Sequence, residues 1–202
     1  MMDKQNKVTG VVLAGGLARR MNKQDKGLID YHNRPMVSYA VDAMAQVAST
    51  VFINANRNIP EYSCFGYQVI SDQTDTFDGP LAGMLSAMNH ATTDILCVMP
   101  CDSPLIRAEH LTKLIDVLTE NNADIAVAFD GERIHPVFLA LKTSLQSSLK
   151  QYLEQGGRKI DLWLEQHNLI KVDFSQMADV FLNINTLSEL NLLEKGKHDS
   201  SN

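Results

Sequence analysis

The chain has 202 residues, of which 45% are hydrophobic, which is enough for one core of ordinary size and too little for two comfortable domains. Its 18 lysines and arginines are outnumbered by 24 aspartates and glutamates, and the formal net charge is −6. Such a chain has no global basic field to hold a nucleic-acid backbone, so nucleic acid is excluded as a partner. We expect a single domain over residues 1–194 and a disordered tail over 195–202.

Neither end of the chain nor its interior suggests a membrane partner. Residues 1–7 are polar and charged and lack the apolar stretch of a secretory signal. The longest apolar runs, such as 95–100, are too short to span a bilayer. The sequence therefore predicts a soluble, cytoplasmic protein.

The three cysteines form neither a CxxC pair nor a zinc-type spacing with histidines. We expect reduced thiols, with Cys97 facing the core. Cys101 stands beside Asp102 in a candidate active loop, but a nucleophilic role would need a base partner that the sequence does not display.

In chain order, short β-branched runs alternate with amphipathic stretches, a pattern typical of a mostly parallel sheet with helices on both faces. In the first half we expect strands at 9–13, 50–54, 67–71 and 94–99, and helices at 35–48 and from residue 80. The run 94–99 is almost continuously apolar, as a central parallel strand should be when both its faces are covered.

The second half continues the alternation. We expect helices at 108–121, 144–154, 159–167 and 186–194, and strands at 123–129, 137–141 and 170–174. Gly156 and Gly157 break the chain between two of these helices. The predicted fold is a single-domain, Rossmann-like α/β structure.

Open α/β sheets bind ligands outside the carboxyl ends of their strands, so the residues that follow each strand matter most. Gly15 and Gly16 follow the first strand, Asn54 ends the second, Asp72 follows the third and Asp102 follows the central one. The sequence predicts a polar site at this edge of the sheet.

The first of these loops, 13–27, has the composition of a phosphate site. The paired glycines Gly15 and Gly16 let the backbone approach a ligand, and Arg20 and Lys26 supply cations that can bracket a triphosphate. Glycines after a strand are also ordinary turn residues. Because this loop of an acidic protein also contains several basic residues, we favour phosphate binding. The P-loop and GxGxxG patterns are both absent, which argues against a kinase, a GTPase switch and a nicotinamide enzyme.

Asp102 lies in a loop stiffened by prolines on both sides, Pro100 and Pro104. Magnesium at phosphoryl-transfer sites is held by one or two carboxylates together with substrate phosphates, and Asp102 is placed to be one of them. The alternative is a cap of the helix that follows. A cap would stand closer to the helix start, so we favour the metal role. In the preceding loop, Asp72 is nearer to its strand than Asp78 and is the better ligand-facing candidate.

Taken together, these residues resemble the molybdenum cofactor guanylyltransferases, enzymes of the nucleotide-diphospho-sugar transferase fold that join GMP from GTP to molybdenum-bound molybdopterin. The resemblance covers residues 11–193. The motifs that carry it are Leu13-Ala14-Gly15-Gly16, Arg20-Met21, Asp25-Lys26-Gly27, Gly79-Pro80-Leu81-Ala82-Gly83, Cys101-Asp102-Ser103-Pro104, His135-Pro136-Val137-Phe138 and Asn183-Ile184-Asn185-Thr186.

The resemblance implies a role for each matching position. It implies a GTP site formed by Leu13, Ala14, Gly15, Gly16, Lys26, Asn54, Asp72 and Asp102. It implies catalytic roles for Arg20, Lys26 and Asp102, with Mg²⁺ on Asp102. It implies that the pterin acceptor is bound by Gly79, Pro80, Gly83, Asn183 and Asn185. The partners it implies are GTP, the molybdopterin cofactor, molybdoenzyme apoproteins and other cofactor-biosynthesis proteins.

Some positions bear on base choice and on the loop. The related cytidylyltransferases begin Leu-Ala-Ala-Gly, so Gly15 favours guanine. The family usually has Ser where this chain has Ala18 and Gly where it has Asn22, so the loop has lost one hydroxyl and some backbone freedom. Asn still tolerates a left-handed conformation.

In the implied reaction a phosphate oxygen of the acceptor attacks the α-phosphorus of GTP in line with the departing pyrophosphate. That phosphate is already ionised, so positioning and charge neutralisation matter more than a general base. We therefore interpret His135 as a strand-edge residue rather than a base. Arg158 and Lys159 either contact the acidic acceptor or are simply solvated.

Two other functions remain open on the residues alone. One is nucleotidyl transfer to a different acceptor, of the cytidylyl or sugar-phosphate type. The other is a non-catalytic module that delivers the completed cofactor. Lys26 and Asp102 argue against the second, because delivery needs no metal-assisted leaving group.

Overall fold

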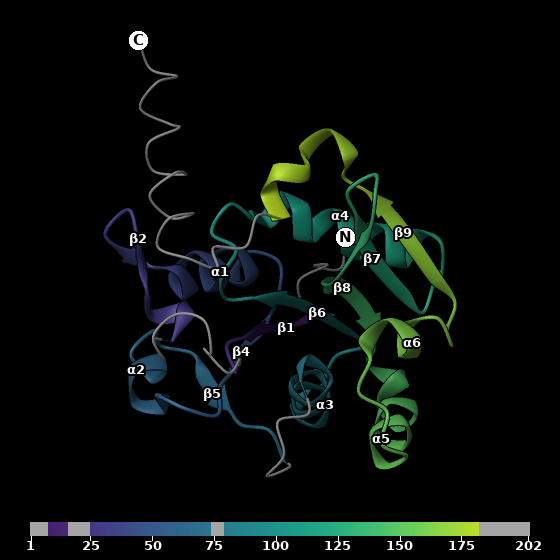
Figure 1. The fold of residues 1–202 in the computed structure, drawn as a ribbon, viewed down its shortest axis with the longest axis horizontal. Coiled ribbons are helices and arrows are strands. Elements are labelled where there is room, and N and C mark those ends of the chain that lie inside the picture. Colours follow the sequence, from purple (N-terminus) through teal and green to yellow (C-terminus); the bar gives the residue numbers. More distant parts are fainter. Residues whose placement is uncertain (1–7, 16–24, 74–78, 182–202) are drawn as a thin grey trace.

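A computed structural model describes residues 8–15, 25–73 and 79–181 of the chain. Its centre is a seven-stranded sheet with the order β5-β4-β1-β6-β8-β7-β9 (Figure 1). The strands are β1 Val8–Leu13, β4 Thr50–Asn54, β5 Gln68–Ile70, β6 Ile95–Pro100, β7 Ile125–Phe129, β8 Ile134–Lys142 and β9 Leu169–Asp173. Only β8 runs antiparallel to its neighbours within this sheet. The carboxyl ends of the six other strands therefore meet at one edge, and the expected mostly parallel sheet is confirmed.

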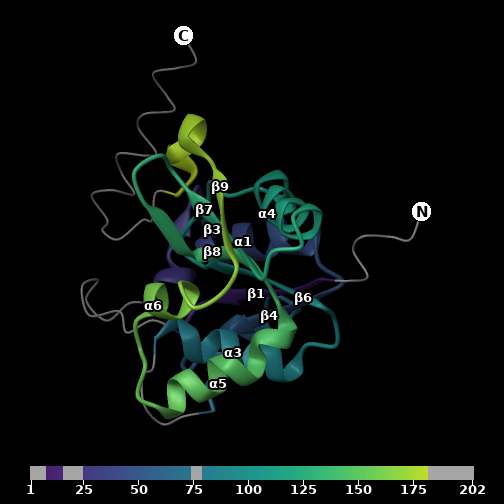
Figure 2. The same cartoon turned by 90° about the vertical axis from the view of Figure 1, so that its right-hand side faces the viewer.

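Helices cover both faces of the sheet. The α-helices are α1 Met36–Ala45, α2 Ile59–Ser63, α3 Pro80–His90, α4 Ala108–Glu120, α5 Gln146–Glu154 and α6 Ile160–Leu164. Figure 2 shows α1 and α4 on one side of the sheet and α3 and α5 on the other. This three-layer arrangement is the predicted α/β architecture.

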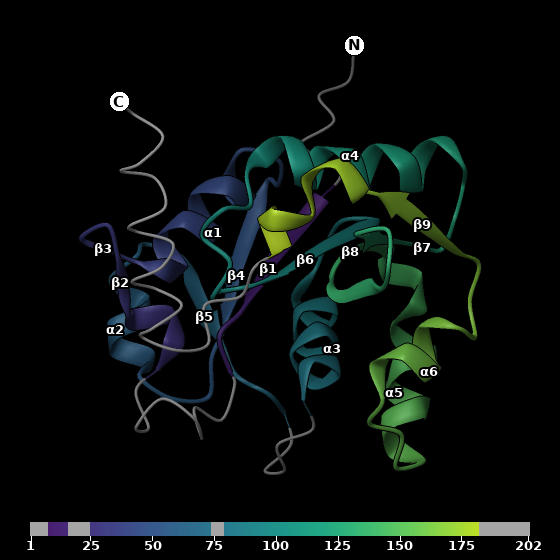
Figure 3. The same ribbon diagram turned by 45° about the horizontal axis from the view of Figure 1, so that its top comes forward.

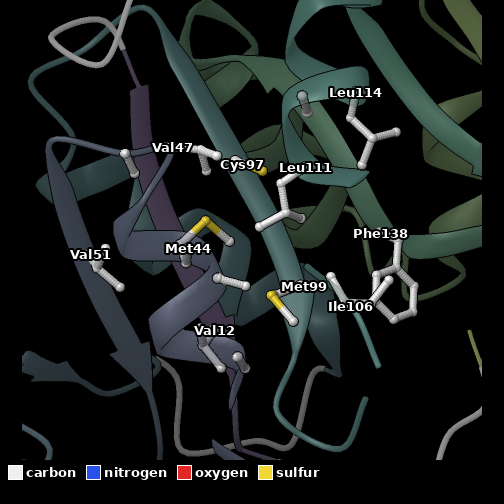
Figure 4. Close-up of a cluster of buried hydrophobic side chains, with 14 of the residues drawn as sticks. Val12, Met44, Val47, Val51, Cys97, Met99, Ile106, Leu111, Leu114 and Phe138 are labelled. Carbon is white, nitrogen blue, oxygen red and sulfur yellow. The ribbon is translucent and has the colours of Figure 1, made fainter. Parts of the chain in front are cut away.

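The core consists of two main apolar clusters separated by the sheet, because successive side chains of a strand point to opposite faces. On β6, Cys97 and Met99 face the cluster under α1 and α4, whereas Leu96 and Val98 face the cluster above α3 and α5. All four side chains are 0% exposed. Figure 4 shows the first cluster, in which Met44 of α1 and Leu111 of α4 approach Met99. The 94–99 run is thus the middle strand that the sequence predicted.

Several short elements lie where the sequence predicted only loops. They are the 3-10 helix η2 Lys26–Leu28, the hairpin strands β2 Asp30–Tyr31 and β3 Arg34–Pro35, the helix α2, and the 3-10 segment η4 Ser175–Phe181. The hairpin turns at His32 and Asn33, which both have positive φ angles, 49° and 60°. The hairpin and α2 gather at the β5 end of the sheet (Figures 1 and 3). Four of these elements have two to five residues, too few for an apolar period to reveal, and the seven-residue η4 is kinked at Met177.

Three expected boundaries were wrong by three residues. The helix predicted at 35–48 ends at Ala45. The strand predicted at 137–141 begins at Ile134, because a bulge beside Val127 and Ala128 lets β8 keep pairing with β7. The helix predicted at 159–167 spans only Ile160–Leu164. The predicted helix at 186–194 and the tail at 195–202 lie outside the described residues. Within the described part, no helix is long and apolar enough to cross a membrane.

Candidate active site

The strands β1, β4 and β6 position two loops of the site, the glycine loop after β1 and the Asp102 loop after β6. The N–H of Ala14 donates to the carbonyl oxygen of Asn54 at 2.8 Å, and the N–H of Cys101 donates to that of Leu13 at 3.1 Å. These bonds continue the parallel ladders of β1 with β4 and of β1 with β6 past the strand ends. The glycine loop and the Asp102 loop therefore leave the sheet side by side, as the sequence predicted.

Asp72 lies in a network of asparagine amides. Its carboxylate accepts the Nδ2 groups of Asn54 at 2.9 Å and Asn56 at 2.8 Å, and its backbone N–H donates to Oδ1 of Asn56 at 2.8 Å. Asn54 is 3% exposed and its Nδ2 also lies 3.4 Å from the carbonyl oxygen of Ile70. The structure thus brings Asn54 and Asp72 together, and it adds Asn56, which the sequence did not single out. Its place two residues beyond a ligand-edge strand was the available signal.

Two glycines border this network. A Cβ atom at Gly83 would lie 2.3 Å from Oδ1 of Asn54, and one at Gly15 would lie 3.4 Å from the same oxygen and 3.2 Å from Nδ2 of Asn56. Gly83 belongs to the first turns of α3, which begins at Pro80 with Gly79 as its N-cap. The predicted acceptor segment and the predicted nucleotide residues are therefore in contact.

Lys26 and Asp102 form the second part of the site. Nζ of Lys26 lies 3.2 Å from Oδ2 of Asp102, whose residue is 8% exposed. The helix after this loop begins at Ala108, with Arg107 as its N-cap, and the ring nitrogen Nδ1 of His110 accepts the N–H of Arg107 at 3.0 Å. Asp102 is five residues from that cap, so the interpretation of Asp102 as a helix cap is wrong.

Asp102 fits a magnesium site of the open kind. Among the residues that the structure describes, no group of three or more His, Cys, Asp or Glu side chains could hold a metal by itself. Magnesium in nucleotide enzymes needs no such cage, because one or two carboxylates suffice when phosphates and water complete the shell. A nearly buried carboxylate at the ligand edge, paired with a lysine, has the chemistry of such a site.

The sequence of this chain matches a known protein family. Residues 10–169 match the family described as MobA-like NTP transferase domain. The chain belongs to this family. A MobA-like NTP transferase is a nucleotidyltransferase, so the expected enzyme class is confirmed.

Two curated relatives cover almost the whole MobA-like chain. The molybdenum cofactor guanylyltransferase of Shewanella piezotolerans is 46% identical over 179 residues, which are 89% of this chain and 88% of that protein. The enzyme of the same name from Shewanella sediminis is also 46% identical over 179 residues, which are 89% of this chain and 91% of that protein. The family resemblance seen in the sequence is confirmed.

A solved structure supports the fold. Molybdopterin-guanine dinucleotide biosynthesis protein A from Archaeoglobus fulgidus superposes with a TM-score of 0.79, covering 95% of this chain and 99% of that one at 20% identity. At this identity the likeness concerns the fold alone, and that fold is the one the sequence predicted.

The two buried cysteines of this MobA-like transferase, Cys97 and Cys101, lack the environment of a nucleophile. Burial raises the pKa of the Cys97 thiol to about 12 and that of the Cys101 thiol well above its usual range, where the negative charges of Asp102 and Asp25 add to the effect. A thiol that stays protonated is a poor nucleophile. Cys97 is fully buried, as predicted.

His135 lies at the same edge of the sheet, at the start of β8. Its Nε2 atom is 2.7 Å from Oδ2 of Asp130, and its ring stacks on Phe181 with centroids 4.3 Å apart. The N–H groups of Arg133 and Glu132, followed by His135, hold the pKa of Asp130 below its usual range. These contacts give His135 a structural role, in line with its interpretation as a strand-edge residue.

The remaining sequence candidates divide into two groups. The guanidinium of Arg158 donates to the carbonyl oxygens of Leu153 at 2.8 Å and Gly157 at 2.7 Å, so it closes the turn after α5. Other candidates lie outside the described residues: Gly16, Ala18, Arg20, Asn22, Asn183 and Asn185.

Proposed function

We propose that this chain transfers GMP from GTP to molybdenum-bound molybdopterin, forming molybdopterin guanine dinucleotide and pyrophosphate. The names of the Shewanella relatives, at 46% identity over nearly the whole chain, support this activity. The observation that carries the proposal is that two polar clusters lie at the same edge of the sheet. One is the Lys26–Asp102 ion pair, and the other is the hydrogen-bond network of Asp72 with Asn54 and Asn56.

In our proposal Asp72 selects the base. An ionised carboxylate only accepts hydrogen bonds. The pairing edge of guanine offers two adjacent donors, N1–H and the N2 amino group, whereas adenine and cytosine each place an acceptor beside their amino donor. A carboxylate held by the amides of Asn54 and Asn56 can accept both guanine donors and meets a repulsive acceptor on the other two bases. Each buried group left unpaired costs about 1–3 kcal/mol, or roughly 5- to 150-fold in affinity.

Lys26 and Asp102 would handle the phosphates. The ammonium of Lys26 is placed to neutralise charge that builds on the triphosphate as the α-phosphorus is attacked. Asp102 would hold Mg²⁺, which when bound neutralises phosphate oxygens and orients them for an in-line displacement. The acceptor phosphate is ionised at neutral pH, so no side chain has to take a proton.

The acceptor would approach along α3. Gly79 and Pro80 begin this helix at the ligand edge, and Gly83 packs against Asn54. We propose that their backbone borders the acceptor, with Asn183 and Asn185 completing the acceptor site, and that Arg20 acts with Lys26 on the triphosphate. The further partners in this proposal are the apoenzymes that receive the finished cofactor.

The test compares substrates directly. Purified protein is incubated with Mg²⁺ and molybdopterin loaded with molybdenum, together with GTP, ATP or CTP, and the product mass is measured alongside nucleotide affinity by calorimetry. We expect guanylylated molybdopterin and a preference for GTP of at least about tenfold. CTP binding as tight as that of GTP would overturn the guanine assignment. Transfer to a sugar phosphate in place of molybdopterin would overturn the acceptor assignment.

A further inference from the structure

We propose that Asp25, held by Tyr62 and Asn58, is a positioning residue that fixes Lys26 beside Asp102 for nucleotidyl transfer. The inference rests on the proposed function only for the role of Lys26. We call Asp25, Tyr62 and Asn58 together the Asp25 anchor.

Both oxygens of the Asp25 carboxylate are bound by side chains from α2 and the residue before it. The Tyr62 hydroxyl donates to Oδ1 at 2.5 Å, and Nδ2 of Asn58 donates to Oδ2 at 3.0 Å. Asp25 is 9% exposed and Tyr62 is 0% exposed. A nearly buried carboxylate is retained at low cost only when its oxygens are bound in this way. The anchor therefore ties the residue before Lys26 to α2.

The side chains of Asp25 and Asn58 do not cap the helices that follow them. Asp25 is the N-cap of η2 and Asn58 is the N-cap of α2, yet neither side chain makes a capping hydrogen bond. Asp and Asn at this position usually bond the free N–H groups of the first turn. Here both side chains turn to each other across 33 residues of sequence. Local helix stability does not account for the pair, whereas attachment of the Lys26 segment does.

The residue after Lys26 packs on the same tyrosine. A Cβ atom at Gly27 would lie 2.6 Å from the Tyr62 hydroxyl oxygen and 3.1 Å from Sγ of Cys101. Cys101 directly precedes Asp102 in the chain. The residues on both sides of Lys26 are thus held against Tyr62, and Gly27 also lies against the side chain of Cys101. We therefore expect loss of the Tyr62 hydroxyl to shift the Lys26 ammonium relative to the Asp102 carboxylate.

Tyr62→Phe is the main test, since it removes the hydroxyl and keeps the ring. Tyr39→Phe is the matched control, because the Tyr39 hydroxyl also makes one short bond, to the carbonyl oxygen of Tyr31 at 2.7 Å. We expect Tyr62→Phe to lower kcat by about 10- to 100-fold, the effect of small displacements at a reacting centre. Tyr39→Phe should leave kcat near the wild-type value. Wild-type kcat in Tyr62→Phe would overturn the proposal.

A second variant guards against a folding defect. Asn58→Gly removes one donor of the anchor and keeps the left-handed backbone at this residue, whose φ angle is 49°. We expect kcat to fall in this variant as well, with a melting temperature close to that of the wild type. An unchanged kcat would show that the second oxygen of Asp25 needs no partner and would contradict the anchor as described.

A double-mutant cycle separates positioning from general stability. If the anchor acts through Lys26, Tyr62→Phe should cause no further loss of kcat in a Lys26→Ala background, although it should lower the melting temperature in both backgrounds. Losses of kcat that multiply in the double variant would refute the positioning role.

The same double-mutant cycle can be measured through GTP affinity, which does not depend on the acceptor. Calorimetry of GTP with Mg²⁺ should show that Tyr62→Phe weakens triphosphate binding when Lys26 is present and has no effect when it is absent. Equal weakening in both backgrounds would overturn the inference. A wild-type protein that binds GTP but makes no guanylylated molybdopterin would overturn the proposed function instead, so the two failures are distinguishable.

Discussion

A methyl group at Gly83 tests how closely α3 must approach the end of β4. The Cβ atom of Gly83→Ala would lie 2.3 Å from Oδ1 and 2.9 Å from Cγ of Asn54, and 2.9 Å from Cδ2 of Leu13. Ordinary contacts of a Cβ atom begin near 3.4 Å, so the amide oxygen would have to move by about 1 Å. Asn54 is bonded to Asp72 and to the carbonyl of Ile70, so it cannot move without weakening those bonds.

The expected cost follows from these contacts. Overpacking a filled site costs about 1–3 kcal/mol, and losing a hydrogen bond to a charged group costs about 1.5–3 kcal/mol. The two costs overlap, because a shift of Asn54 relieves the overpacking but weakens its hydrogen bond to Asp72. Replacing a helical glycine by alanine returns roughly 0.5–1 kcal/mol. We therefore expect a net loss of about 0.5–2.5 kcal/mol, or roughly 1–10 °C in melting temperature for a chain of this size.

The assay combines thermal melts with GTP calorimetry. Gly83→Ala should melt lower than the wild type and bind GTP at least about tenfold more weakly, since the displaced Asn54 no longer supports Asp72. In an Asn54→Ala background the new methyl meets no amide oxygen, so the same substitution should cost less. A Gly83→Ala protein that melts and binds GTP like the wild type would show that the close approach has no part in the site.

Two further predictions concern charge. Asp102→Asn keeps the side-chain shape and loses the negative charge, so turnover should fall and be partly restored by high magnesium, with little change in melting; a magnesium titration like that of the wild type would contradict a metal role. Burial lowers the pKa of His110 from its ordinary value of 6.5, so the unfolded chain binds more protons in acid. The contribution of His110 to the free energy of unfolding should therefore be complete above about pH 6.5. It should fall as the pH drops through that value toward the pKa of His110 in the folded state. His110→Gln should reduce this fall, and the part that remains is expected from His167, whose pKa is also lowered by burial. An equal fall in both proteins, measured by urea unfolding at about pH 7.5 and 5.5, would assign the effect to other groups.

Much of the ligand edge is predictable because it depends on local signals. The run at 94–99 is apolar on both faces, so it had to be a covered strand, and the polar residue after it had to lie at the sheet edge. The strand at 50–54 has the bounds that the sequence predicted, which places Asn54 at its end. These inferences need only the period of the apolar residues and the rule that ligands bind outside the carboxyl ends of strands.

The direction of β8, in contrast, could not be predicted from the sequence pattern. Its residues 137–141 are apolar and were correctly expected to form a strand. An apolar pattern specifies which faces are covered but says nothing about the direction in which the strand runs. That direction is decided by the pairing of β8 with β6 and β7, and by the bulge that extends it to Ile134. It is the reason that His135 lies at the ligand edge.

The sequence by itself determined the order of the longer strands and helices and the main residues at the ligand edge, Gly15, Asn54, Asp72 and Asp102. These features follow from spacings of a few residues, which the chain specifies directly. Only the tertiary structure decided how the side chains are held, such as Asp25 on Tyr62, 37 residues away, or Gly83 against Asn54. Contacts of this kind depend on how separate elements pack together, because burial makes each polar group depend on whichever partner the fold brings to it.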